Sequence, residues 1–312
     1  MKTENYEVIV VGMGVTGFAA GMYAGRLGLK TLVIGEFEGG TINYAHDVEN
    51  YPGFDSISGA NLAAKIEKHA REYDIKILKA RVEKVEKRGN CFFVTADSKV
   101  LQTSTIIFAT GSEWRKLEVP GSKEFEGRGV TYCALCDGPL FKGKTVAVVG
   151  GSDSAAKEAL LLTEYAKKVF IIYRKEKIHP EPATLKQVEE KVKKGKIEII
   201  NNTNVIEIKG RKVLENLKLD KAYKNKKELK VEGLFVAIGQ IPQSTLAKNL
   251  GVRLNDKSEI MINKKSETSV EGIFAAGDVT DMPFKQAIIG VSGGVVAAHT
   301  AYEYARKTRV CE

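Results

Sequence analysis

The chain has 312 residues, of which 43% are hydrophobic and 30 are glycine, and this composition is typical of a globular α/β protein large enough for two domains. No run of 18 apolar residues occurs and the first residues are mostly polar, so we expect neither a membrane span nor a signal peptide, and a cytoplasmic protein. The net charge of +9 comes from lysines scattered among glutamates without a recognition motif, so we expect no nucleic-acid partner.

The first elements form a βαβ pattern. The run at 6–11, apolar except for Glu7, predicts a buried parallel strand, residues 15–27 predict a helix, and residues 31–34 predict a second strand.

The turn after the first strand carries the spacing of a dinucleotide-binding site. Gly12 allows the tight turn, Gly14 lets a pyrophosphate approach the backbone, and Gly17 lets the helix pack close to the strand. The phosphates would lie at the helix N-terminus. Glu36, the next acid, is a candidate ribose ligand, and an exposed loop acid is the alternative.

A dithiol motif follows in the middle of the chain, where two residues separate Cys133 from Cys136 and Asp137 comes next. A thiolate is the nucleophile of disulfide exchange, and CxxC spacing lowers the pKa of one thiol. The adjacent carboxyl group can supply or remove a proton, and an acid that only caps a turn is the alternative. A zinc site would need a second pair of ligands, so we expect no metal.

The βαβ pattern then repeats, with a strand at 145–149, a helix at about 154–166 and a strand at 169–173. The second glycine turn comprises Gly150, Gly151, Ser152, Asp153 and Ser154. Two dinucleotide sites and a dithiol suggest an electron relay from a nicotinamide through a flavin to a disulfide.

A late strand belongs with the first βαβ unit. Residues 106–109 form a strand that ends in Thr110-Gly111, and residues 272–276 form one that ends in Gly277-Asp278, beyond the second unit. We therefore predict an α/β fold of two doubly wound, Rossmann-like dinucleotide-binding domains, with the second inserted into the first. The expected boundaries are 1–115 and 244–312 for the first domain and 116–243 for the second.

These motifs recur together in one family. They are the two glycine turns, Gly39-Gly40, the segment 48–53, Thr110-Gly111, the CxxC-Asp-Gly at 133–138, Gly277-Asp278 and Lys285-Gln286-Ala287. Over essentially its whole length the chain resembles the low-molecular-weight thioredoxin reductases. The dithiol distinguishes this subgroup from related flavoproteins.

The resemblance implies an FAD site in the first domain. Gly12, Gly14 and Gly17 would meet the pyrophosphate, Asp278 would bond the ribitol or phosphate region, and the other positions implied are Gly39, Gly40, Thr41, Asn50, Thr110, Gly111, Gly277, Lys285, Gln286 and Ala287. It also implies that Cys136 faces the flavin, that Cys133 attacks the protein disulfide, and that Asp137 is the acid/base. A homodimer is implied as well.

The nicotinamide site is implied at the second glycine turn, together with Arg174 and Lys175. Ser152 stands where the family usually has a third glycine, and His179 stands where NADPH-using relatives have a further arginine. Because a cation favours a 2′-phosphate, we expect NADPH. NADH, or a donor such as ferredoxin or a reduced deazaflavin, is the alternative.

We therefore expect a thioredoxin-disulfide reductase that passes electrons from NADPH through FAD and the dithiol to a thioredoxin-like protein. The alternatives are a similar reductase fed by ferredoxin, and a redox-sensing flavoprotein without turnover.

Overall fold

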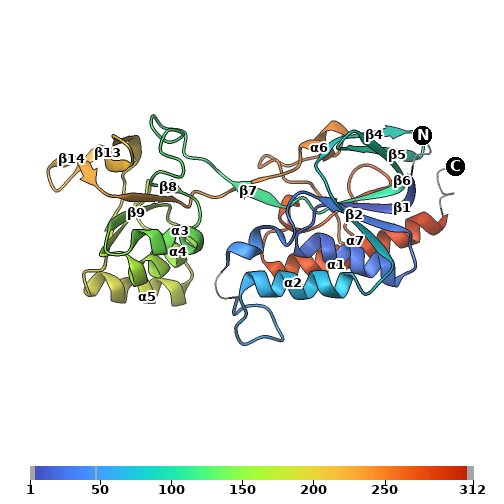
Figure 1. Ribbon diagram of the computed structural model, residues 1–312, viewed down its shortest axis with the longest axis horizontal. Coiled ribbons are helices and arrows are strands. Elements are labelled where there is room, and N and C mark those ends of the chain that lie inside the picture. Colours follow the sequence, from blue (N-terminus) through green and yellow to red (C-terminus); the bar gives the residue numbers. More distant parts are fainter. Residues whose placement is uncertain (1–3, 46–47, 308–312) are drawn as a thin grey trace. The chain divides into compact units, whose positions relative to one another are not determined.

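The computed structural model describes residues 4–45 and 48–307 of the chain (Figure 1). It divides into two compact units, one made of residues 1–113 and 241–312 and the other of residues 114–240. The boundaries expected from the sequence lie within three residues of these.

The first unit is built on a mixed sheet in the order β3-β2-β1-β6-β5-β4, with β17 also paired to β6. The pairs among β1, β2, β3, β6 and β17 are parallel, whereas β4, β5 and the first half of β6 are antiparallel. The strands are β1 (Glu4–Val11), β2 (Thr31–Gly35), β3 (Ile75–Lys79), β4 (Val82–Arg88), β5 (Cys91–Ala96), β6 (Lys99–Phe108) and β17 (Ile273–Ala275).

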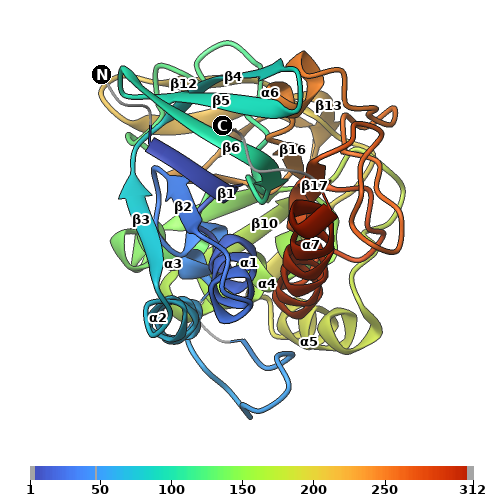
Figure 2. The same ribbon diagram turned by 90° about the vertical axis from the view of Figure 1, so that its right-hand side faces the viewer.

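Helices cover one face of this sheet, as Figure 2 shows for α1, α2 and α7. Side chains alternate along β1, so Val8 and Val10 pack with the helices while Ile9 and Val11 face a second core on the other side. The helical elements are α1 (Val15–Arg26), α2 (Gly59–Ala70), α6 (Thr245–Asn249) and α7 (Ala287–Lys307), with 3₁₀ turns η1 (Gly40–Tyr44) and η3 (Gly277–Val279).

The second unit holds an all-parallel sheet in the order β11-β10-β9-β15-β8 and a separate antiparallel sheet, β12-β13-β14. The parallel strands are β8 (Val130–Thr131), β9 (Thr145–Val149), β10 (Lys168–Ile172), β11 (Ile197–Ile200) and β15 (Gly233–Val236). The antiparallel strands are β12 (Val205–Gly210), β13 (Leu214–Tyr223) and β14 (Lys226–Lys230). The helices are α3 (Ala134–Asp137), η2 (Gly138–Phe141), α4 (Asp153–Tyr165) and α5 (Pro182–Lys193).

The chain passes between the units at β7 (Ser112–Trp114) and β16 (Gln240–Pro242), which pair with each other. The predicted fold class, two doubly wound α/β units with the second inserted into the first, is confirmed. Within the described residues, no helix is long and apolar enough to cross a membrane.

Candidate active site

The first glycine turn is tightly packed at Gly12 and Gly17 and less crowded at Gly14. A Cβ at Gly12, where φ is +122°, would lie 2.1 Å from the carbonyl oxygen of Ala109, and a Cβ at Gly17 would lie 1.9 Å from that of Gly12. At Gly14 the nearest atoms would be 3.9 Å away. Gly14 is also the N-cap of α1 and offers no side-chain bond to the first amides. The turn therefore fits an anionic group held by backbone N–H donors.

A second glycine pair lies against this turn. The N–H of Gly39 donates to the carbonyl oxygen of Met13 at 2.8 Å, and a Cβ at Gly40 would lie 3.0 Å from the Cα of Gly14. Thr41, within η1, is exposed, as is Glu36 directly after β2. Residues 39–41 and the first glycine turn are therefore neighbours, as the FAD assignment needs.

Two residues expected at the flavin meet although they are 236 positions apart in the sequence. The amide nitrogen of the Asn50 side chain donates to Oε1 of Gln286 at 2.8 Å. Gln286 directly precedes α7, which begins at Ala287. The hydrogen bond brings Asn50 to the start of this helix.

Thr110 and Gly111 are bound to the returning chain. The Thr110 hydroxyl donates to the carbonyl oxygen of Gln243 at 2.7 Å, and the Gln243 N–H donates to that of Gly111 at 2.9 Å. Both residues therefore help to hold the connection near β16. No motif in the sequence marks Gln243 as the partner of Thr110 and Gly111.

Asp278, in η3, carries a partly buried carboxylate. Burial raises the pKa of Asp278 above its ordinary value, and the positive charge of Lys285 offsets part of the rise. The carboxylate has no hydrogen-bond partner among the residues that the structure describes. A partly buried acceptor without a donor fits a bound hydroxyl-rich group, such as the ribitol of FAD.

Lys285 has protein partners of its own. Its Nζ lies 3.0 Å from Oε1 of Glu259 and donates to the carbonyl oxygen of Thr280. Burial alone would raise the pKa of Glu259, but hydrogen bonds from Asn255 and Lys285 lower it. Sequence reasoning missed Glu259, which fixes the segment that leads into α7.

In the second unit the glycine turn is equally tight. A Cβ at Gly150 would lie 2.2 Å from the carbonyl oxygen of Ala237, and one at Gly151 would lie 2.5 Å from the ring of Tyr173. Ser152 is the N-cap of α4 with φ of −80°, so its backbone needs no glycine. Its side chain makes no cap bond. Replacing the family's third glycine therefore causes no backbone strain.

Asp153 joins α4 to the start of α5. Its carboxylate accepts the Glu181 N–H at 3.0 Å and pairs with Nζ of Lys157 at 2.9 Å. Burial alone would raise the pKa of Asp153, but Lys157, the Glu181 amide and Thr184 together lower it. This side chain therefore has a structural partner, whereas Ser154 is exposed.

The loop after β10 folds back on the second glycine turn. The His179 N–H donates to the carbonyl oxygen of Gly151 at 2.8 Å, and its Nδ1 lies 3.1 Å from the Tyr173 hydroxyl. Arg174 and Lys175 are exposed directly after the strand, and neither forms an ion pair with another described residue. The strand end therefore carries two adjacent cations, and Glu176 follows them.

The cysteines of the CxxC motif form a disulfide, with 5.4 Å between their Cα atoms. Cys133 is the N-cap of α3, and the Cys136 N–H donates to the Cys133 sulfur at 3.1 Å. Cys136 is exposed and Cys133 is partly buried. The Asp137 carboxylate is hydrogen-bonded to the hydroxyl of Thr131, a residue that sequence reasoning missed. Disulfide, acid and hydroxyl thus lie together at the end of β8.

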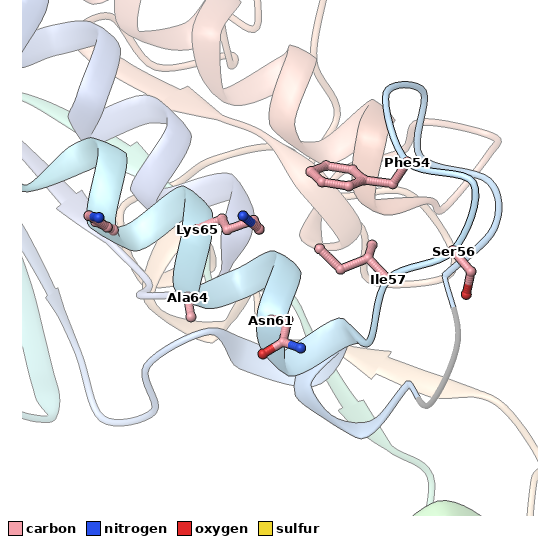
Figure 3. Close-up of a pocket in the computed structure, with 7 residues that line it drawn as sticks. Phe54, Ser56, Ile57, Asn61, Ala64 and Lys65 are labelled. Carbon is pink, nitrogen blue, oxygen red and sulfur yellow. The ribbon is translucent and has the colours of Figure 1, made fainter.

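A shallow groove of about 390 Å³ lies elsewhere on the first unit, between α2 and the loop before it (Figure 3). It is lined by Phe54, Ser56, Ile57, Asn61, Ala64, Lys65 and Lys68. None of the expected cofactor residues lines it, so it is separate from the candidate site.

Known proteins match this chain over nearly all of its length. The family model of pyridine nucleotide-disulphide oxidoreductases matches residues 6–307. The thioredoxin reductase of Bacillus subtilis (strain 168) is 37% identical over 302 residues, which cover 96% of this chain and 94% of that protein. The NADH dehydrogenase of the same organism is 34% identical over 303 residues, which cover 96% of this chain and 59% of that protein. A solved structure, the thioredoxin reductase of Lactococcus lactis, matches with a TM-score of 0.91 and 32% identity, covering 97% of this chain and 100% of that one. The chain therefore belongs to the pyridine nucleotide-disulphide oxidoreductase family.

Proposed function

We propose that this chain is an FAD-dependent thioredoxin-disulfide reductase. The observation that carries the proposal is the Cys133–Cys136 disulfide with Asp137 beside it, in a unit that also contains a dinucleotide-type glycine turn. The relatives named as thioredoxin reductases match the chain over nearly its whole length. Bound FAD would take two electrons from a reduced nicotinamide and deliver them to the disulfide.

The residues of the first unit suit FAD. The backbone at Gly14, at the N-terminus of α1, would hold the pyrophosphate, and the unpaired carboxylate of Asp278 would accept a hydrogen bond from a hydroxyl of the ribitol. The hydrogen bond between Asn50 and Gln286 would fix two polar side chains at the flavin. The remaining positions proposed in this site are Gly12, Gly17, Glu36, Gly39, Gly40, Thr41, Thr110, Gly111, Gly277, Lys285 and Ala287.

The dithiol would transfer the electrons by two exchanges. The Cys133 thiolate attacks one sulfur of the substrate disulfide, forming a mixed disulfide and expelling the other substrate sulfur as a thiolate. The Cys136 thiolate then attacks the Cys133 sulfur, restores the disulfide and expels the second substrate thiolate. Two electrons pass from the dithiol to the substrate, and Asp137 moves a proton from an attacking thiol to a leaving sulfur.

The proposed donor is NADPH, bound at the second glycine turn, where Gly150, Gly151, Ser152, Asp153 and Ser154 lie. The unpaired cations Arg174 and Lys175 support a 2′-phosphate at the end of β10. NADH, or a donor such as ferredoxin or a reduced deazaflavin, would replace NADPH if these cations do not bind phosphate.

The proposed electron acceptor is a thioredoxin-like protein in the cytoplasm, and the proposed assembly is a homodimer. Leu140, four residues after Cys136, is 69% exposed and offers an apolar contact beside the dithiol. A flavoprotein that senses redox state without turnover is the rival, because it would need the same disulfide but no acceptor.

Trapping of the acceptor tests the roles of the two thiols. When oxidised thioredoxin is mixed with the reduced Cys136→Ser variant and the released thioredoxin thiol is alkylated at once, we expect a mixed disulfide through Cys133, because the variant lacks the Cys136 thiol that would resolve it. Cys133→Ser should trap none. Mass spectrometry of the unreduced complex identifies which cysteines form the mixed disulfide. The double variant Cys133→Ser/Cys136→Ser is the control. The opposite pattern would exchange the roles assigned to the two thiols. Trapping by neither variant would count against a thioredoxin-like acceptor.

A further inference from the structure

One hydroxyl group bonds to both ends of the short helix that carries the dithiol. Oγ1 of Thr131 accepts the Cys133 N–H at 3.3 Å and is hydrogen-bonded to Oδ2 of Asp137. Cys133 is the N-cap of α3, and Asp137 is the last residue of that helix. Thr131 is only 8% exposed, so solvent does not readily compete for these bonds.

The sheet fixes the position of this hydroxyl. Thr131 is the last residue of β8, and it lies opposite Phe235 in the parallel pair of β8 and β15. A helix as short as α3 is not stable by itself, so contacts outside it must set its position. The buried side chain of Ala134 supplies one such contact, and Thr131 supplies a polar one.

A hydroxyl can serve Asp137 in both of its protonation states. It has one proton to donate and two lone pairs. Thr131 can therefore donate to the ionised carboxylate while a lone pair accepts the Cys133 N–H. When the carboxyl group is protonated, the hydroxyl can accept its proton instead. An apolar side chain of the same shape can do neither.

We propose that Thr131 is a positioning residue for proton transfer at the dithiol, which holds the Asp137 carboxyl group next to Cys133 and Cys136 throughout the exchange. The inference rests on the proposed function, because it assumes that Asp137 moves the proton. In the balanced step, the dithiol and a substrate disulfide become the Cys133–Cys136 disulfide and two substrate thiols. Thr131 exchanges no electrons and keeps its own proton at the end.

Other ionisable groups lie on the elements around α3. On α4, which packs against α3, Tyr165 has its ring against Gly138, and Glu158 shares that helix face. Burial raises the pKa of Glu158 to about 8. Tyr132 lies between Thr131 and Cys133, and burial raises its pKa as well. A test must separate Thr131 from these three groups.

The experiment measures the exchange of the chemically reduced protein with oxidised glutathione as a function of pH. Acid-quenched samples are analysed by mass spectrometry for the closed Cys133–Cys136 pair. The variants are Thr131→Val, Thr131→Ser, Asp137→Asn and the double variant Thr131→Val/Asp137→Asn. Thr163→Val is the matched control, because its buried hydroxyl in the same unit donates only to the Leu160 carbonyl oxygen.

For Thr131→Val we expect roughly a tenfold slower exchange near neutral pH, the effect of losing one hydrogen bond to a charged group. Thr131→Ser should restore the wild-type profile, and Thr163→Val should keep it. In the Asp137→Asn background, Thr131→Val should have no further effect, whereas effects through Glu158, Tyr165 or Tyr132 would persist.

A Thr131→Val profile that coincides with wild type, a Thr131→Ser variant as slow as Thr131→Val, or a further loss in the Asp137→Asn background would overturn the proposal. Thermal unfolding is measured first, and Thr131→Ala replaces Thr131→Val if the latter does not fold. The assay needs neither FAD, a nicotinamide nor thioredoxin. If the proposed function is wrong, the protein will not reduce thioredoxin, but the pH profiles of glutathione exchange will still show the effect of Thr131.

Discussion

At the scale of single residues, the unpaired carboxylate of Asp278 is the strongest structural sign of a bound cofactor. Asp278→Ala should weaken FAD retention by about 1–3 kcal/mol, because a ligand hydroxyl loses its acceptor in a partly buried site. Titration of the apoprotein with FAD, followed by flavin fluorescence, measures the change. Asp256→Ala, an exposed acid in the same unit, is the control and should bind FAD as wild type does. If the Asp278→Ala variant binds FAD with the affinity of the wild type, Asp278 does not contact FAD.

Arg174 tests the choice of nicotinamide. Arg174→Ala should raise the KM for NADPH by roughly tenfold and leave the KM for NADH nearly unchanged, because only NADPH loses a charge-assisted bond to its 2′-phosphate. Initial rates of flavin-dependent nicotinamide oxidation give both constants. Arg211→Ala, an exposed arginine elsewhere in the second unit, should alter neither. If both constants of Arg174→Ala match wild type, Arg174 is a surface cation.

Neither Thr131 nor Glu259 was identified from the sequence, although the charges that they contact were. Asp137 and Lys285 belong to motifs that can be read locally. Their partners are ordinary residues whose importance arises when a strand end or a loop brings them within hydrogen-bond distance. Such contacts leave no spacing pattern.

At the scale of elements, α4 carries a buried acid that should make stability depend on pH. Oε2 of Glu158 has no hydrogen-bond partner among the described residues, and burial raises the pKa of Glu158 from 4.5 to about 8. The folded protein therefore retains a proton that the unfolded chain releases. This stabilising effect is complete below about pH 4.5 and is lost as the pH rises through about 8.

Glu158→Gln should abolish this dependence, which has a slope of at most about 1.4 kcal/mol per pH unit. Denaturant unfolding across that range should show the wild type losing stability relative to the variant as the pH rises. Glu164→Gln, an exposed acid on the same helix, should follow the wild type. Parallel curves for wild type and Glu158→Gln would show that Glu158 does not retain the proton.

Sequence patterns identified the parallel strands and their glycine turns but not the antiparallel sheet β12-β13-β14. The mostly apolar runs of β1 and β9 predict buried strands of a parallel sheet in an α/β protein. In β13, buried Leu214, Leu217 and Leu219 alternate with lysine, asparagine and glutamate. From the sequence we interpreted this lysine-rich stretch as a solvated surface. It is a half-exposed strand, whose charged residues face the solvent while its leucines are buried.

At the scale of the whole molecule, the insertion was predictable because the late Gly277-Asp278 turn belongs with the first glycine turn. The structure brings them together, since a Cβ at Gly277 would lie 2.7 Å from the hydroxyl of Thr16 on α1. The four hydrophobic clusters each belong to one unit. Each dinucleotide turn therefore has its own supporting core.

The central claim is that electrons leave the protein through the Cys133–Cys136 pair to a thioredoxin-like protein. The most direct measurement is anaerobic turnover of the FAD-loaded protein with NADPH and oxidised thioredoxin, counting nicotinamide oxidised and thioredoxin disulfide reduced. We predict equimolar amounts for wild type, and no thioredoxin reduction by Cys133→Ser/Cys136→Ser although that variant keeps its FAD. If the wild type is inactive with both NADPH and NADH, the measurement is repeated after chemical reduction of the FAD. Thioredoxin reduction by the double variant, or none by the wild type with reduced FAD, would contradict the account.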